Sequence, residues 1–213
     1  MIGKVILRDC RRSWAGGAAA MPIVFVLLVA TLVPFALGPD TALLRATGGG
    51  ILWIAALLAS LLPVDRLIDP DREGGVLDQL VVRGMRDETI IAAKLAAHWL
   101  NFGPPLLIAI LPAAALLQLP GETILRVGLS LAIGTPGLAA LAIMVAALTS
   151  GLRSSSALVG LLVLPLAVPL LIFGAGSLGP DGGSALKLLG AASLLLVAMA
   201  PFAGGAALRA GRE

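Results

Sequence analysis

The sequence predicts an all-α integral membrane protein with six transmembrane helices. Of its 213 residues, 59% are hydrophobic and only 13% are charged, whereas an ordinary soluble domain is about 25% charged. A mean hydropathy of +1.03 leaves too few polar side chains to cover a water-soluble protein of this size. The chain also contains six uncharged segments of the right length, since about 20 apolar residues cross roughly 30 Å of hydrocarbon.

Short polar breaks separate these six segments, and none of the segments is long enough to cross the membrane twice. The expected spans are Ala15–Pro39, Ala46–Val64, Leu95–Gly121, Val127–Leu152, Ser154–Pro180 and Leu188–Leu208. The second is only just long enough. Three of the breaks are too short to fold as separate domains, so we expect residues 1–213 to form a single transmembrane domain.

Residues Met1–Trp14 are expected to form an amphipathic helix that lies in the plane of the lipid headgroups. At 100° per residue, apolar side chains fill one arc of about 140° and cations fill the opposite arc. The apolar set is Ile2, Ile6, Leu7, Cys10 and Trp14, and the cationic set is Lys4, Arg8, Arg11 and Arg12. The alternative is a basic flank that only sets the membrane topology.

The first apolar run is expected to be retained as a span, because no A-x-A-type cleavage site stands out at its end. The single cysteine, Cys10, excludes an intramolecular disulfide and a metal site built from several cysteines. The net charge is only +3, and no basic stripe is interleaved with aromatic residues. These features argue against nucleic-acid binding.

The distribution of positive charge predicts the orientation. Twelve of the fifteen lysines and arginines fall on the side that holds both termini and the loop Asp65–Lys94, and three fall on the other side: Arg45, Arg126 and Lys187. By the positive-inside rule, both termini and this loop should be cytoplasmic.

The loop Asp65–Lys94 is the one long polar segment, and it holds five of the fifteen cations and seven of the twelve carboxylates. Between Gly75 and Gly84, Val76, Leu77, Leu80 and Val81 share one helical arc, with Val82 as the exception. Such a short helix is unstable alone in water, so we expect it to lie on the membrane or in a partner's groove.

The next helix is expected to start near Asp87, a suitable N-cap residue, and to continue directly into the third span. Force applied to the short helix would therefore reach the bundle through a nearly rigid connection. The alternative is a surface loop that only sets topology.

Missing motifs exclude several classes of function. The sequence has no G-x-x-x-x-G-K-[ST] loop for nucleotide phosphates, no G-x-S-x-G elbow and no H-E-x-x-H pair. None of the six expected spans contains an Asp or Glu, which argues against an ion-coupled transporter or a proton pump. If the protein drives work, we expect the energy to come from a partner.

His98 and Asn101 are the candidate polar side chains inside the bundle. His98 lies one helical turn beyond Lys94, and it could be a haem ligand or a gate residue, or a neutral histidine that hydrogen-bonds to a neighbouring helix or lies at the interface. Asn101 could line a path or make hydrogen bonds between helices. We expect the second role for both. Trp53 and Trp99 are expected to be packing or interface residues. No nucleophile or second metal ligand lies near His98 in the sequence, so no catalytic residue and no metal site is expected.

The chain resembles the cytochrome c maturation protein B (CcmB) family, the permease subunit of a bacterial ABC transporter called a haem exporter. The resemblance rests on residues 50–58 (GILWIAALL), 71–80 (DREGGVLDQL) and 93–99 (AKLAAHW). Later runs also match, at residues 134–136, 162–166, 169–173, 201–203 and 206–209. In place of the proline-containing turn usual in the family, this chain has Arg83-Gly84-Met85.

The resemblance implies a type-2 ABC exporter permease fold in the bacterial inner membrane. An interfacial helix would occupy Met1–Trp14, and a cytoplasmic coupling helix would occupy Glu73–Val82. It implies a separate ATPase subunit (CcmA), which binds the ATP, and the companions CcmC, CcmD and the haem chaperone CcmE. The expected role is either haem export or release of haem-loaded chaperone. No histidine stands in the expected outer loops, so haem is expected only as an indirect substrate, with no cofactor bound directly.

The residues expected to contact the ATPase form one set in the coupling segment. They are Arg72, Glu73, Leu77, Asp78, Gln79 and Leu80, with the two leucines as apolar anchors. Two alternatives remain open: a type-2 permease for a lipid or a hydrophobic drug, and a non-transporting assembly scaffold of the maturation complex.

Overall fold

The computed structural model describes residues 1–38, 40–151, 155–179 and 182–212, with the backbone alone for residues 155–164. Every regular element in these residues is a helix. The elements are α1 (Ile2–Ala15), η1 (Ala18–Ala20), α2 (Met21–Leu37), α3 (Thr41–Leu61), α4 (Val64–Leu67), α5 (Asp69–Glu73), α6 (Val76–Val82), α7 (Asp87–Leu116), α8 (Gly121–Thr149), α9 (Ser155–Gly176) and α10 (Gly182–Ala210).

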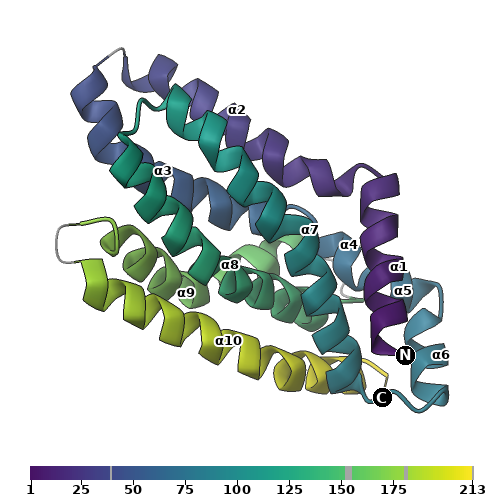
Figure 1. The fold of residues 1–213 in the computed structure, drawn as a ribbon. Helices are drawn as coiled ribbons and strands as arrows, with labels where there is room; N and C mark the ends of the chain where they lie inside the picture. The colour runs from purple at the N-terminus through teal and green to yellow at the C-terminus, as the bar shows by residue number, and fades with distance from the viewer. Residues whose placement is uncertain (39, 152–154, 180–181, 213) are drawn as a thin grey trace.

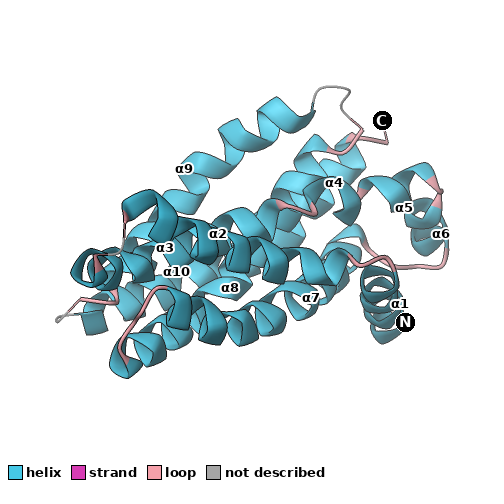
Figure 2. Ribbon diagram, turned by 90° about the horizontal axis from the view of Figure 1, so that it is seen from above, coloured by secondary structure: helices cyan, strands magenta, loops and turns pink. Residues whose placement is uncertain are grey.

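The long helices form one bundle, and the short helices gather at one end of it (Figure 1). Helix α8 lies at the centre and packs against α3, α7, α9 and α10. The N-terminus, the C-terminus, α1 and the polar segment α4–α6 share one end, while the α2–α3 and α7–α8 turns lie at the other. The view from above shows the same separation (Figure 2). The predicted grouping of both termini with the polar loop is confirmed.

Five helices are long and apolar enough to cross a membrane, counting only the residues that the structure describes: the stretch Ala18–Leu37, α3, α7, α8 and α10. They correspond to five of the six predicted spans. Helix α9 occupies the position of the remaining one, but its described apolar side chains cover only Pro165–Gly176. Ser154 and Pro180, the predicted limits of that span, lie outside the described residues. The exact count of six therefore stays a prediction.

Several helices begin before the uncharged segment that predicted them. Helix α3 begins at Thr41 rather than Ala46, because the Asp40 side chain accepts hydrogen bonds from the backbone N–H groups of Ala42 and Leu43, at 2.9 and 3.2 Å. Helix α7 begins at Asp87, with Arg86 in the N-cap position. The prediction that Asp87 is the N-cap is therefore wrong. The predicted continuity of this helix with the third span is confirmed.

Trp53 of α3 organises the centre of the bundle. Its ring is fully buried, and its Nε1 donates a hydrogen bond to Ser130 Oγ of α8 at 2.9 Å. Gly134 of α8 and Gly174 of α9 lie directly against the ring. Trp99 is similarly fixed, since its Nε1 donates to Thr135 Oγ1 at 3.2 Å. The predicted packing role of both tryptophans is confirmed.

Gly134→Ala should destabilise the bundle, because the added Cβ would overlap the Trp53 ring. We expect a loss of about 1–3 kcal/mol, the usual cost of overpacking a core. The measurement is the unfolding transition in detergent. Gly128→Ala on the same helix is the matched control, since no atom lies within 4 Å of its added Cβ. Equal stability of the two variants would contradict this description of the core.

Candidate functional site at the polar end of the bundle

The polar loop folds into three short helices, of which α6 is the predicted one. Gly75 precedes α6 with φ of 67°, and Gly84 follows it with φ of 86°. This left-handed conformation is readily adopted only by glycine, so the two glycines allow sharp turns on either side. The prediction of a short helix between glycines is confirmed.

The apolar face of α6 is turned toward the chain itself. Leu77 and Leu80 are 3% and 9% exposed and belong to the hydrophobic core, and α6 packs against α5 and α7. The predicted apolar arc is correct, but its predicted place on the membrane or in a partner's groove is not what the structure shows. Leu77 and Leu80, assigned as apolar anchors for a partner, offer little surface in this conformation.

The outward face of this segment is formed by other residues. Glu73, Asp78 and Gln79 are exposed, and Val82 is 87% exposed. Asp78 forms a weak ion pair with Arg212 at 3.5 Å. Val82, the last residue of α6, is thus an apolar side chain that the described chain leaves uncovered.

Arg72 is engaged within the chain rather than free for a partner. Its guanidinium donates to the carbonyl oxygens of Ser150 and Gly211 at 2.8 and 2.6 Å, and to Ser150 Oγ at 3.0 Å. These bonds tie the polar loop to the end of α8 and to the C-terminal tail. Arg72 therefore has an anchoring role that the sequence did not reveal.

A buried ion cluster joins α1, α5 and α7. Asp71 of α5 is 3% exposed and Lys94 of α7 is 5% exposed, and the Lys94 Nζ lies 2.6 Å from Asp71 Oδ2. Nζ also donates to the Leu67 carbonyl at 3.0 Å and to Asp9 of α1 at 3.4 Å. All three protons of the ammonium are thereby used, as a buried cation requires.

Two arginines of α1 complete the cluster. Arg8 forms ion pairs with both Asp71 and Asp9, and Arg12 reaches Asp71 Oδ1 at 3.2 Å. Burial alone would raise the pKa of the Asp71 carboxyl, but the charges of Lys94 and Arg8 outweigh burial, and the pKa is lowered from the ordinary 3.8. Asp71 therefore stays ionised and holds three cations together.

Helix α1 therefore has three faces of different character rather than the predicted apolar and cationic two: a buried face, a face toward the ion cluster and an exposed face. Val5 is buried against the bundle, and Asp9 faces the cluster, whereas Leu7 and Trp14 remain 51% and 60% exposed. Of the four cations assigned to lipid, only Lys4 and Arg11 are free of ion pairs within the described chain. Arg8 and Arg12, which were assigned to the lipid surface, both pair with the buried Asp71, although the side chain of Arg12 remains 62% exposed. Their contact with lipid stays a prediction.

A second ion cluster fixes the end of α10 and the C-terminal tail to the start of α7. Arg209 lies 2.5 Å from Glu88 and 3.9 Å from Asp87, and Arg212 also pairs with Asp87. Asp87 is 6% exposed. The residue expected to cap α7 therefore binds the tail instead.

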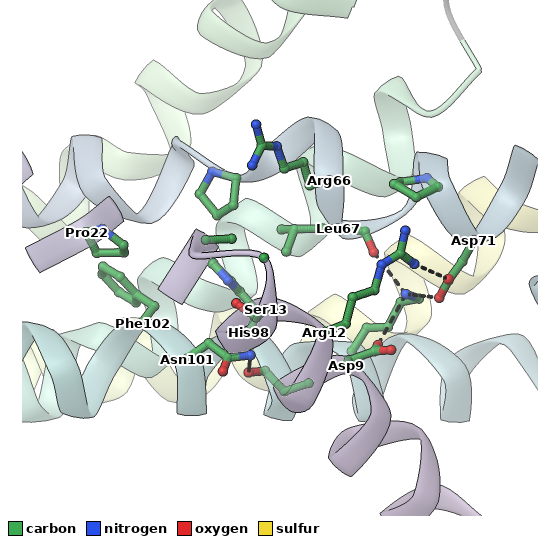
Figure 3. Close-up of a pocket in the computed structure, with 16 residues that line it drawn as sticks. Asp9, Arg12, Ser13, Pro22, Arg66, Leu67, Asp71, His98, Asn101 and Phe102 are labelled. Carbon is green, nitrogen blue, oxygen red and sulfur yellow. Dashed lines mark hydrogen bonds and ion pairs between the residues drawn. The ribbon is translucent and has the colours of Figure 1, made fainter. Parts of the chain in front are cut away.

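A cavity of about 420 Å³ lies between α1, the start of α2, α4, α5 and α7. His98 and Asn101 form part of its wall, together with the ion cluster (Figure 3). His98 is 4% exposed, and its ring stacks on Phe102 with a centroid separation of 5.8 Å. Within the described residues, His98 Nε2 and Asn101 Oδ1 are buried without a hydrogen-bond partner. The structure thus brings the two predicted polar residues to one site.

Comparison with known proteins identifies the family of this chain. The family model described as CcmB protein matches residues 1–211. The chain belongs to the CcmB family. Heme exporter protein B of Paracoccus denitrificans is 44% identical, with 96% of this chain and 97% of that protein covered. Heme exporter protein B of Rhodobacter capsulatus is 42% identical with the same coverage, and that of Escherichia coli (strain K12) is 40% identical with 89% of each chain covered.

Within this CcmB family member, sequence reasoning missed the Asp71–Lys94 pair. The two residues are 23 positions apart, and no periodicity links them. Lys94 carried one signal, since it stands among apolar residues at the start of a span. No feature of the sequence distinguishes Asp71 from the other six carboxylates of the loop.

Asp71→Asn should release α1 from α7, because it removes the anion that three cations share. Breaking a buried ion pair in this way costs about 3–5 kcal/mol. Cys10 is a native reporter, since its Sγ lies 3.9 Å from the Ala97 carbonyl of α7, and burial raises the pKa of its thiol. We expect Cys10 to react with a neutral maleimide at least ten times faster in the variant. Asp65→Asn, at an exposed carboxylate of the same loop, should leave the rate unchanged.

The same cluster predicts a dependence of stability on pH. Because the pKa of Asp71 is lower in the folded chain than the ordinary 3.8, its contribution is fully present above about pH 4 and is lost as the pH falls through the folded value. The unfolding transition should therefore lose this contribution only below about pH 4. The acid-dependent loss should be smaller in Asp71→Asn. A loss of stability between pH 7 and pH 5 that Asp71→Asn abolishes would contradict the assignment.

Proposed function

We propose that this chain is the transmembrane permease subunit of an ABC transporter that serves haem delivery for cytochrome c maturation. Family membership over residues 1–211 carries the proposal, together with relatives named Heme exporter protein B at 40–44% identity. These relatives favour haem over a lipid or a hydrophobic drug as the molecule served.

The energy for this function is expected from a separate ATPase subunit, CcmA, since the chain has no phosphate-binding loop. CcmC, CcmD and the haem chaperone CcmE are the further proposed partners, in the bacterial inner membrane. The excess of cations on the side of the polar loop supports cytoplasmic termini, which would place α6 where a cytoplasmic ATPase can reach it.

The proposed contact with the ATPase is the outward face of α5 and α6. Glu73 and Gln79 would supply polar contacts, with Asp78 beside them, and Val82 would supply an exposed apolar contact. Movement of this face would pass inward by two routes: through Leu77 and Leu80 to the core, and through Asp71 to Lys94 of α7.

Two modes of action remain within this proposal. The chain could export haem, or it could transmit the work of the ATPase so that haem-loaded chaperone is released. A non-transporting scaffold is the rival, and blocking ATP hydrolysis in the partner separates it from both. A scaffold would keep its role without hydrolysis, whereas a coupled permease would not.

Val82→Asp should weaken binding of the ATPase subunit, because it places a charge in the proposed apolar contact. We expect co-purification of the ATPase and the yield of c-type cytochromes to fall at least fivefold, with normal membrane insertion. Val82→Thr, which keeps the shape of the side chain, should have a smaller effect. Full co-purification and a normal yield with Val82→Asp would exclude α6 as the contact.

A further inference from the structure

Within the described residues, Arg72 alone makes hydrogen bonds or ion pairs both to the end of α8 and to the C-terminal tail. Its Nη1 donates to the carbonyl oxygen of Ser150, the C-cap residue of α8, at 2.8 Å. Its Nη2 donates to the carbonyl oxygen of Gly211, directly after α10, at 2.6 Å. Carbonyl groups at a helix C-terminus lack donors within the helix, and the helix dipole favours a cation there. One guanidinium therefore caps two long helices at once.

The guanidinium of Arg72 packs against two glycines, neither of which has room for a side chain. A Cβ added to Gly151 would lie 2.8 Å from Arg72 Cζ, and one added to Gly211 would lie 2.9 Å from Nη1. Ser150 Oγ accepts a further hydrogen bond from Nη1 at 3.0 Å and donates to the Ala147 carbonyl of α8 at 3.1 Å. The narrow slot and the two carbonyl groups both suit the flat, forked donor group of arginine.

Helices α8 and α10 run in the same direction and both end at the polar end of the bundle (Figure 1). Their backbones are in close contact farther along, because a Cβ added to Gly137 of α8 would lie 2.9 Å from Ser193 Cα of α10. The distance along α8 from Gly137 to Ser150 is about 20 Å. A small tilt of α10 about this contact would therefore change the separation of the two helix ends that Arg72 joins.

The polar loop has room to move relative to the end of α10. A cavity of about 330 Å³ lies between them, with Leu77 and Asp78 of α6 on one side and Gly211 and Arg212 on the other. Asp78 and Arg212 form an ion pair at 3.5 Å, but the side chain of Asp78 is 68% exposed, and exposed ion pairs add little stability. Hydrogen bonds from a charged donor are roughly twice as strong as neutral ones, so Arg72 is the stronger connection here.

We propose that Arg72 is a positioning residue for coupling, which holds the polar ends of α8 and α10 at a fixed separation and releases both when the polar loop is displaced. This rests on the proposed function, in which an ATPase subunit moves the outward face of α5 and α6. Because Arg72 belongs to α5, one displacement of that helix withdraws a single guanidinium from both helix ends.

The separation of the two ends is measured by double electron–electron resonance on the full-length chain in detergent. Spin labels are attached through Leu148→Cys and Ala210→Cys, at exposed positions near the ends of α8 and α10, after Cys10→Ser removes the native thiol. We expect a narrow distance distribution in this background and one at least twice as wide when Arg72→Gln is added. Arg66→Gln, at an exposed arginine of the same loop, is the matched control and should leave the width unchanged.

A second variant disturbs the slot and keeps the arginine. The Cβ of Gly211→Ala would displace the guanidinium, which is the movable end of a long side chain, so the distribution should widen here as well. Gly183→Ala on the same helix has no atom within 4 Å of its added Cβ and should leave the width unchanged. Arg72→Lys keeps the charge without the forked donors and should give an intermediate width.

The assembled transporter tests the role in coupling, through the yield of c-type cytochromes per ATP hydrolysed. A residue that only supports the fold would lower hydrolysis and yield together, whereas a positioning residue lowers the ratio of yield to hydrolysis. We expect Arg72→Gln to reduce this ratio at least fivefold and Arg72→Lys to reduce it less. Arg66→Gln should leave it unchanged.

An unchanged distance distribution in Arg72→Gln would overturn the proposal, and Gly211→Ala decides in the same way if that variant does not insert into the membrane. An unchanged ratio of yield to hydrolysis would also overturn it. Failure of the unaltered chain to bind any ATPase subunit would instead contradict the proposed function, and the distance measurements would still show whether Arg72 joins the two helix ends.

Discussion

The ion pair between Asp71 and Lys94 is the contact on which the polar end of this bundle depends. Both side chains are at least 95% buried, and each would be costly to bury alone. Arg8 and Arg12 bring α1 to the same carboxylate. One anion therefore fixes the interfacial helix, the polar loop and the third long helix relative to one another, and the wall of the cavity with His98 and Asn101 depends on that arrangement.

This arrangement explains how movement of the ATPase subunit could reach the transmembrane helices in the proposed function. A partner on the outer face of α6 would act on a segment that is held from within by Leu77 and Leu80, and beside it by Asp71 and Arg72. Arg72 connects the polar loop to the end of α8. The ion pair between Arg209 and Glu88 connects the loop to α10. The polar loop is thus attached to three long helices, so displacement of α6 has direct routes into the bundle.

Patterns of neighbouring residues in the sequence predict the helices of this site. They do not predict the contacts between residues that are far apart in the sequence. Glycines on either side of an apolar arc were sufficient to find α6, and composition was sufficient for a multi-pass helical protein. The direction in which Leu77 and Leu80 face could not be predicted, because an apolar arc fits a membrane, a partner or the chain's own core equally well. Arg8 and Arg12 were assigned to lipid because a helical wheel shows neighbours along one helix and not a carboxylate 59 or 63 residues away.

The most direct test of this account is the behaviour of the assembled transporter when Asp71 is replaced by Asn. ATPase activity co-purifying with the chain and the yield of c-type cytochromes would be measured on the same preparation. The account predicts that the ATPase remains bound and hydrolyses ATP, because the outer face of α6 is unchanged, while the cytochrome yield falls at least fivefold. A normal yield from a correctly inserted Asp71→Asn variant would show that the buried ion cluster does not connect the polar loop to function.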